Sequence, residues 1–371
     1  MSVDPAGVVN ADFRTPIGWR DGHLQSIRNR VVPDRWKPDV LAPPERLLVD
    51  TGDGTGDQLS VLLHRAPPAA DGDVDGAIAF GTGLPTVLLV HGLGGSADST
   101  YIRAAAVGLL RSGFDVARVD LRSAGESTRT TRHMYHAGKS EDLRAVLRNL
   151  ARRQAVTAGG QPRQQPRPEP TLALMGFSLG GAVTLKLLGE PTEGLPIVAG
   201  VAVSAPIDLV AGSPHLTATL HGVYERAILR TLRRDALTPA PDGTDRVSPA
   251  ERAGIQRARR LPDFDDVLTA PRNGWQDADE YYRRNSAAPF LPRIRVPTLM
   301  IHAQDDPMIP FGPYEAVDWA ALQRLGYVQR AITPHGGHVG FHQRGRAAPW
   351  YVPMAVRFLA QASGQDESRR C

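Results

Sequence analysis

Short apolar runs alternate with amphipathic stretches along most of the chain. The runs have strand length and are bounded by glycine and proline, whereas the stretches between them show the spacing of helices. This alternation is typical of βαβ units in a mainly parallel sheet. It predicts an antiparallel hairpin from the first two of eight strands and a parallel set from the rest, at residues 46–50, 59–64, 86–90, 115–120, 171–176, 198–204, 298–302 and 327–332.

Between the strands, residues 142–155 place four apolar side chains at helical spacing and arginines on another face, which predicts a crossover helix packed on the sheet. Residues 207–292 do not follow the strand rhythm, because they are mostly helical and fall between two predicted strands. We therefore expect an α/β core from residues 1–206 and 293–371, with residues 207–292 inserted as a helical cap. Three stretches rich in glycine, proline and polar residues are expected to be surface loops: 67–85, 157–170 and 239–249.

Composition adds few constraints. The 371 residues are 42% hydrophobic and 22% charged, and no run approaches the roughly 18 apolar residues of a membrane span. The first residues lack a basic segment followed by an apolar one, so we expect no secretory signal and a cytoplasmic protein. The single cysteine is Cys371, which excludes an internal disulfide framework and a cysteine nucleophile within the fold.

The net charge of +4 comes mainly from arginines, some of them clustered near residues 230–234 and 252–260. Such clusters can meet phosphates or lipid headgroups, but no nucleic-acid-binding motif accompanies them. We therefore interpret them as a solvated face and expect no nucleic-acid partner. Residues 220–237 form a basic helix with Leu220, Tyr224, Ile228 and Leu232 along one side, which suggests either a cap packing face or, in a non-catalytic alternative, a peripheral membrane-binding surface.

The first candidate catalytic motif is G-F-S-L-G at residues 176–180. An apolar run precedes this motif and a helix-like segment follows it. G-x-S-x-G in that context places a serine on a tight strand-to-helix turn, where flanking glycines allow the backbone to expose the hydroxyl. Ser178 is therefore predicted to be a nucleophile. The alternative is a glycine-rich turn whose serine only caps the helix.

A serine hydroxyl needs a histidine as base and a carboxylate that orients this base. In folds that place the serine on a G-x-S-x-G turn, the carboxylate comes after the serine and before the histidine along the chain. The strand at 298–302 runs into a turn with two aspartates. Asp306 is preferred because hydrolases with this turn usually place the acid four residues before the proline matched by Pro310; Asp305 is the alternative. His338, in the glycine-rich loop after the last strand, is the predicted base.

His335, His338 and His342 also have the spacing of a metal cluster. Glycines and a proline around them disfavour a helical ligand face, and no cysteine nearby supplies a further ligand. We therefore predict no metal site and no cofactor. The oxyanion of acyl transfer also needs donors. We expect the backbone N–H of Leu179, after the nucleophile, and that of Leu93, in the H-G-L-G-G loop after the first parallel strand.

Several motifs together resemble the YheT-like branch of the α/β hydrolases, which includes ABHD-type esterases and lipases and yeast ethanol acyltransferases. The resemblance runs from about residue 17 to 360. It is carried by G-H-L-Q-S at 22–26, H-G-L-G-G at 91–95, S-T-Y-I-R at 99–103, D-L-R-S-A-G-E at 120–126, Y-H-A-G-K-S-E-D-L at 135–143, G-F-S-L-G-G at 176–181, A-Q-D-D-P at 303–307 and G-G-H-V-G-F at 336–341.

The resemblance implies the α/β-hydrolase fold and carboxylic ester hydrolysis through Ser178, Asp306 and His338. The expected partner is a small ester with a short to medium acyl chain, because a helical cap over an apolar pocket suits an acyl chain. An acyltransferase that passes the acyl group to an alcohol is the alternative that keeps the same triad. The sequence assigns no oligomeric state.

Overall fold

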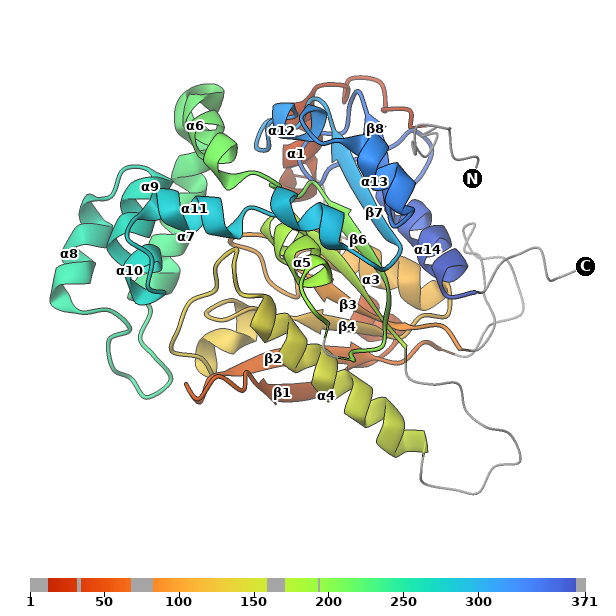
Figure 1. Ribbon diagram of the computed structural model, residues 1–371, viewed down its shortest axis with the longest axis horizontal. Helices are drawn as coiled ribbons and strands as arrows, with labels where there is room; N and C mark the ends of the chain where they lie inside the picture. The colour runs from red at the N-terminus through yellow and green to blue at the C-terminus, as the bar shows by residue number, and fades with distance from the viewer. Residues whose placement is uncertain (1–12, 32–34, 68–82, 159–170, 193, 365–371) are drawn as a thin grey trace, which may run out of the picture.

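Eight strands form one sheet within the residues that the computed structural model describes, which are 13–31, 35–67, 83–158, 171–192 and 194–364. The strands occupy the regions that the sequence predicts (Figure 1). They are β1 (Glu45–Asp50), β2 (Gln58–His64), β3 (Thr86–Val90), β4 (Val116–Val119), β5 (Leu172–Phe177), β6 (Ile197–Val203), β7 (Thr298–Ala303) and β8 (Val328–Thr333).

The strand order is β1-β2-β4-β3-β5-β6-β7-β8. β1 pairs with β2 in antiparallel register, as the predicted hairpin requires, and β2 is antiparallel to β4. All pairs from β4 to β8 are parallel. Because the carboxyl ends of β5, β7 and β8 lie at the same edge of the sheet, the turns after these three strands meet there.

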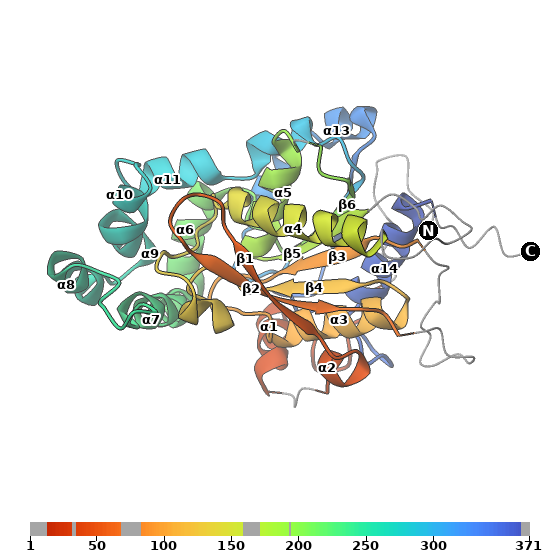
Figure 2. The same cartoon turned by 90° about the horizontal axis from the view of Figure 1, so that it is seen from below.

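Helices cover both faces of the sheet. In β3, Leu88 and Val90 belong to the hydrophobic cluster that includes α4 and α5, whereas Val87 and Leu89 belong to the cluster that includes α3 and α14. Successive side chains of a strand point to opposite faces, so the two clusters fill the two sides of the sheet. Figure 2 shows α4 and α5 above the sheet and α3 below it. These helices are α3 (Thr100–Arg111), α4 (Ser140–Ala158), α5 (Leu179–Gly189) and α14 (Tyr351–Ala362).

The predicted helix at 142–155 is thus part of α4. Shorter elements complete this part of the fold: α1 (Gly22–Val31), α2 (Pro38–Leu41), η1 (Gly125–Arg129), η4 (Ala288–Arg293), α12 (Gly312–Glu315) and α13 (Trp319–Leu325). The expected loops at 67–85 and 157–170 lie mostly outside the described residues. The expected loop at 239–249 contains neither helix nor strand up to residue 248, and Pro249 begins the helix α8 (Pro249–Arg257).

The segment between β6 and β7 is helical throughout its regular parts. Its helices gather on the left of Figure 1 and share a hydrophobic cluster of their own that includes Leu216, Leu229, Ile255 and Phe264. The elements are α6 (Leu209–Ala218), η2 (Thr219–Gly222), α7 (Val223–Leu237), α8 (Pro249–Arg257), α9 (Leu261–Phe264), the π-helical turn η3 (Asp265–Thr269), α10 (Ala270–Arg272) and α11 (Ala278–Asn285).

The basic helix expected at 220–237 begins later than the sequence pattern indicates. Leu220 and His221 have φ angles of 45° and 51°, and Gly222 has 75°, so the chain is left-handed there and α7 starts only at Val223. Leu220 is half exposed. The other three residues of the apolar stripe, Tyr224, Ile228 and Leu232, line an internal cavity instead of an outer surface.

Candidate active site

Ser178 occupies a sharp turn between β5 and α5. Its φ of 51° and ψ of −125° are uncommon for a residue with a Cβ. The two glycines of the motif are needed for close packing. A Cβ on Gly176 would lie 2.3 Å from the Gly180 oxygen, and one on Gly180 would lie 2.4 Å from the His91 oxygen. The local sequence therefore fixes a strained turn that presents the serine side chain.

The structure brings Ser178, His338 and Asp306 into one hydrogen-bonded line. The Nε2 atom of His338 lies 2.9 Å from the Ser178 Oγ, and its Nδ1 lies 2.9 Å from an Asp306 carboxylate oxygen. The Asp306 side chain is fully buried, and that of His338 is 9% exposed. This geometry lets the imidazole take a proton from the serine while the carboxylate holds the ring.

Asp306 is the aspartate that contacts the ring. Its other carboxylate oxygen accepts the backbone N–H groups of Met308, at 2.8 Å, and Ile309, at 3.0 Å. Burial alone raises the pKa of Asp306, but the charge and hydrogen bond of His338, together with His302 and the Met308 N–H, outweigh burial and hold this pKa below its ordinary value. The carboxylate is therefore ionised at neutral pH and fixed in orientation.

Asp305 contacts the loop that carries His338, not the ring. One of its oxygens accepts the Gly337 N–H at 2.9 Å, and the other lies 3.2 Å from the His335 ring. Ser204, which follows β6, holds the same loop by accepting the Val339 N–H at 3.1 Å. The two neighbouring aspartates thus have different contacts: Asp306 contacts the imidazole of His338, and Asp305 contacts Gly337 and His335 in the same loop.

Helix α1 supplies further acceptors to the histidine loop. Ser26 Oγ accepts the backbone N–H of His338 at 2.7 Å, and Gln25 accepts the N–H of His342 at 2.7 Å. Gln25 is fully buried, whereas Leu24 and Ile27 of the same helix are each 38% exposed. An ordinary packing helix buries its apolar face. α1 buries a polar one, so its contacts with the His338 loop are hydrogen bonds.

We expect Ser26→Ala to lower kcat for ester hydrolysis by about tenfold with little change in KM. The substitution leaves the His338 N–H without its acceptor and loosens the position of the ring. Steady-state kinetics on a p-nitrophenyl ester measure both parameters. Ser26→Thr keeps the hydroxyl and is the matched control. Equal kcat values for the alanine and wild-type proteins would contradict this role.

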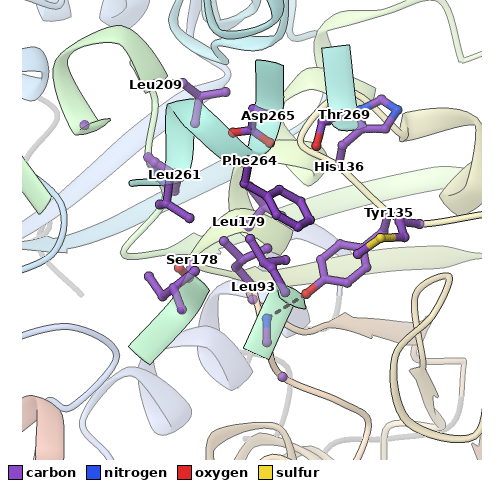
Figure 3. Close-up of a pocket in the computed structure, with 18 of the residues that line it drawn as sticks. Leu93, Tyr135, His136, Ser178, Leu179, Leu209, Leu261, Phe264, Asp265 and Thr269 are labelled. Carbon is purple, nitrogen blue, oxygen red and sulfur yellow. Dashed lines mark hydrogen bonds between the residues drawn. The ribbon is translucent and has the colours of Figure 1, made fainter. Parts of the chain in front are cut away.

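The loop after β3 lies against the serine. A Cβ on Gly92 would be only 2.8 Å from the Ser178 Cβ. Two tyrosine hydroxyl oxygens accept hydrogen bonds from the backbone N–H groups on either side of Leu93. Tyr101 accepts from Gly92 at 3.0 Å, and Tyr135 accepts from Gly94 at 2.6 Å. Figure 3 shows the Tyr135 hydroxyl reaching the loop beside Leu93.

The two predicted oxyanion donors are the N–H groups of Leu93 and Leu179. Both residues line the cavity that contains Ser178. Neither N–H has a hydrogen-bond partner within the part of the chain that the structure describes. Leu179 is the first residue of α5, where N–H groups have no partner inside the helix. Both donors are therefore available to a developing negative charge beside Ser178.

His91 fixes the start of this loop. Its Nε2 accepts the Leu121 N–H at 3.1 Å, so its Nδ1 carries the proton and donates to the Gly92 oxygen at 2.8 Å. Burial lowers the pKa of His91 to about 4, although the bond to Gly92 acts in the opposite direction. The ring is therefore neutral at pH 7 and serves as both donor and acceptor.

This neutral ring predicts a pH effect on stability. Between pH 6.5 and about 4, the unfolded chain binds a proton at His91 that the native protein does not, so the free energy of unfolding falls as the pH falls. We expect wild type to lose about 1.4 kcal/mol per pH unit more than His91→Asn in this range. Urea unfolding measures the difference, and the two slopes should coincide above pH 7. Parallel slopes below pH 6 would contradict the prediction.

A cavity of about 590 Å³ opens at Ser178 and His338. Its walls come from the loops after β3, β5, β7 and β8 and from the helical segment between β6 and β7. Figure 3 shows Leu209, Leu261 and Phe264 over Ser178 and Leu179. The apolar lining includes Leu93, Met134, Leu179, Leu209, Leu216, Ile228, Leu232, Leu261, Phe264, Leu268 and Met308. Such a surface suits an aliphatic chain next to the serine.

The three histidines with metal-like spacing have separate partners. His338 contacts Ser178 and Asp306, His335 contacts Asp305, and His342 lies 2.9 Å from the Arg28 guanidinium. Among the described residues, no three histidine, cysteine or acidic side chains converge to form a metal site. Over the same residues, no helix combines the length and apolarity that crossing a bilayer requires.

Four residues that contact the site have no role that the sequence predicts: Gln25, Ser26, Tyr101 and Tyr135. Each lies within a motif that carries the family resemblance, and this position was the only available signal. Tyr101 contacts Gly92, which is nine residues away, whereas Gln25, Ser26 and Tyr135 contact segments much farther along the chain. The hydrophobic pattern carries no information about such contacts.

Comparisons with known proteins show the family to which the chain belongs. A family model described as the alpha/beta hydrolase fold matches residues 85–344. YheT of Escherichia coli (strain K12), which its name marks as a candidate esterase, is 35% identical over 334 residues, covering 90% of this chain and 87% of that protein. The chain belongs to the YheT-like family of α/β-hydrolase esterases.

Two Saccharomyces cerevisiae proteins are also similar to this YheT-like chain. Monoacylglycerol lipase is 29% identical over 74% of this chain and 59% of its own length. Medium-chain fatty acid ethyl ester synthase/esterase 2 is 28% identical over 75% of this chain and 62% of its own length. Among solved structures, a Pyrococcus furiosus esterase aligns with a TM-score of 0.56 over 89% of this chain and 95% of that one, at 17% identity, which shows the shared fold.

Proposed function

We propose that this YheT-like protein hydrolyses carboxylic esters of short to medium acyl chains, with Ser178 as nucleophile, His338 as general base and Asp306 as the orienting acid. The observation that carries the proposal is the hydrogen-bonded line of these three side chains at the mouth of an apolar cavity. The similarity to proteins named as esterases and lipases supports the same reaction.

The mechanism is a two-step acyl transfer. His338 takes the Ser178 proton as the hydroxyl oxygen attacks the ester carbonyl, and the N–H groups of Leu93 and Leu179 stabilise the oxyanion. The protonated imidazole then gives its proton to the leaving alcohol, which leaves an acyl-serine. Water, deprotonated by His338, attacks this acyl group, and the acid departs as the serine regains its proton. No cofactor takes part.

We also propose a division of the chain into two parts. Residues 207–292 form a helical cap over the active site, and residues 1–206 and 293–371 form the catalytic core. Support comes from the cavity lining, because side chains of α6, α7 and α9 lie opposite the turns that carry Ser178 and His338. A cavity of about 590 Å³ is within the usual range for small-molecule sites.

The test combines labelling with a substrate series. A fluorophosphonate probe should modify Ser178, identified by mass spectrometry of the labelled peptide, and p-nitrophenyl esters from acetate to palmitate should be hydrolysed best at short to medium length. Labelling at another residue would refute the assignment of the nucleophile. Highest activity on palmitate would refute the proposed chain length.

Acyl transfer to an alcohol is the second candidate function. It is favoured by the similarity to the yeast protein named as both an ethyl ester synthase and an esterase. The triad would be the same, with ethanol in place of water in the second step. Product analysis with octanoyl esters in the presence of ethanol distinguishes the two, since ethyl octanoate forms only by transfer.

A further inference from the structure

The wall of the cavity formed by the helices between β6 and β7 carries a group of polar side chains. We call Ser213, Asp265, Thr269 and Tyr282 the distal polar patch. All four line the cavity, and they come from α6, η3 and α11. In Figure 3, Asp265 and Thr269 lie side by side, and Phe264 and Leu261 lie between them and Ser178 in this view.

Hydrogen bonds organise the distal polar patch. The Tyr282 hydroxyl donates to a carboxylate oxygen of Asp265 at 2.6 Å. The Thr269 side chain acts on Asp265 and the Ser213 side chain acts on Tyr282, and each of these contacts lowers the pKa of the group it reaches. A carboxylate can accept about four hydrogen bonds. Asp265 therefore keeps acceptor capacity beside the cavity after the bond from Tyr282 is made.

The carboxylate of Asp265 is unusual for its surroundings. The residue is only 9% exposed and is adjacent in sequence to Phe264 in the apolar wall. Within the residues that the structure describes, no cation pairs with it, and the charge that acts on it is that of Asp266. Burial raises the pKa of Asp265 to about 6. A buried, unpaired carboxylate costs free energy that an apolar residue at this position would avoid.

The backbone at this position is also irregular. Asp265 begins η3, a π-helical turn of five residues between α9 and α10. Such turns inside helices are rare and occur frequently at functional sites. The costly carboxylate and the rare turn coincide on the wall of the cavity that contains Ser178, which indicates a contact with substrate.

We propose that the distal polar patch binds a hydroxyl group of the ester substrate, so that the preferred substrates carry a free hydroxyl remote from the scissile bond. This inference rests on the proposed function and specifies its substrate class. A hydroxyl can donate to the Asp265 carboxylate, and the Thr269 or Ser213 hydroxyl can rotate to donate its single proton to the substrate oxygen. It also brings no second charge into an apolar cavity, which distinguishes it from an ammonium group.

The experiment compares matched esters with and without the hydroxyls. One pair is 1-octanoylglycerol and propyl octanoate, and the other is the p-nitrophenyl esters of 10-hydroxydecanoic and decanoic acids. We expect wild type to prefer the hydroxylated member of at least one pair in kcat/KM. Asp265→Asn should reduce that preference by about tenfold, and Thr269→Val should reduce it in the same direction.

Asp266→Asn is the matched control. It removes the neighbouring carboxylate of the same turn, which accepts the Ala278 N–H and does not line the cavity. Loss of its charge only favours the ionised form of Asp265, so the preference should not fall. Wild type without preference in either pair, or an unchanged preference in both Asp265→Asn and Thr269→Val, would overturn the inference while leaving ester hydrolysis intact. Retained hydrolysis in Ser178→Ala would instead overturn the proposed function, and the inference with it.

Discussion

Ser178→Ala should lower kcat for ester hydrolysis by about 10⁶-fold and abolish fluorophosphonate labelling. The alanine side chain has no oxygen to attack the carbonyl, so no acyl-enzyme forms. The oxyanion donors and the cavity remain, and they account for the small rate that would persist above the uncatalysed reaction. The measurement is the hydrolysis rate of a p-nitrophenyl ester together with gel detection of the probe.

The serine turn is strained, so loss of activity must be separated from loss of fold. The midpoint temperature of thermal unfolding of Ser178→Ala should equal or exceed that of wild type, because alanine keeps the packing of the turn. Ser363→Ala, which removes a hydroxyl that does not line the cavity, should retain both activity and labelling. A labelled and active Ser178→Ala would place the nucleophile elsewhere.

Substitution of the two neighbouring aspartates, Asp305 and Asp306, should reduce kcat to very different extents. Asp306→Asn should lower kcat by about 10⁴-fold. The asparagine amide can donate to Nδ1 of His338, which moves the ring proton to Nε2 and removes the base that Ser178 needs. Asp305→Asn should lower kcat by less than about tenfold, because its amide oxygen can still accept the Gly337 N–H.

The pair of variants is its own control, because both remove one carboxylate from the same turn. Kinetics at pH 7 and 8 on one ester are sufficient, with circular dichroism to verify the fold. If Asp305→Asn loses the larger share of activity, the acid is Asp305 and the contacts of His338 must rearrange in the working enzyme. Equal losses would mean that the turn acts only as a structural unit.

Local sequence determined much of the scaffold. Strand positions follow from apolar runs between glycine and proline, and the order of runs and amphipathic stretches predicted the parallel sheet that the structure contains. The helix expected at 142–155 lies within α4 (Ser140–Ala158). Ser178 could be singled out because a strand, a G-x-S-x-G turn and a helix are contiguous, so the information needed for that turn lies within about a dozen residues.

The start of α7 shows where local pattern fails. Leu220 continues the apolar spacing of the helix, yet the chain is left-handed at residues 220–222. Periodicity records which face a side chain would occupy if the helix continued, and it does not record where the backbone turns. Tyr224 and Ile228 line the cavity, whereas the sequence alone left the role of this apolar stripe open between packing and a membrane-binding surface.

The tertiary structure alone decided which distant residues support the site. The His338 N–H donates to Ser26, 312 residues away along the chain. In the loop after β3, two tyrosine hydroxyls accept the N–H groups of Gly92 and Gly94, whereas the N–H of Leu93 has no partner among the described residues. Asp265 is, in sequence, one acid among several in a polar helical stretch, and only the fold places it on the cavity wall. Hydrophobic periodicity and short motifs encode local geometry, whereas these contacts depend on how separate elements meet. The sequence by itself therefore determined the sheet and the G-x-S-x-G turn, and the packing of the elements determined which groups surround that turn and which side chains line the cavity.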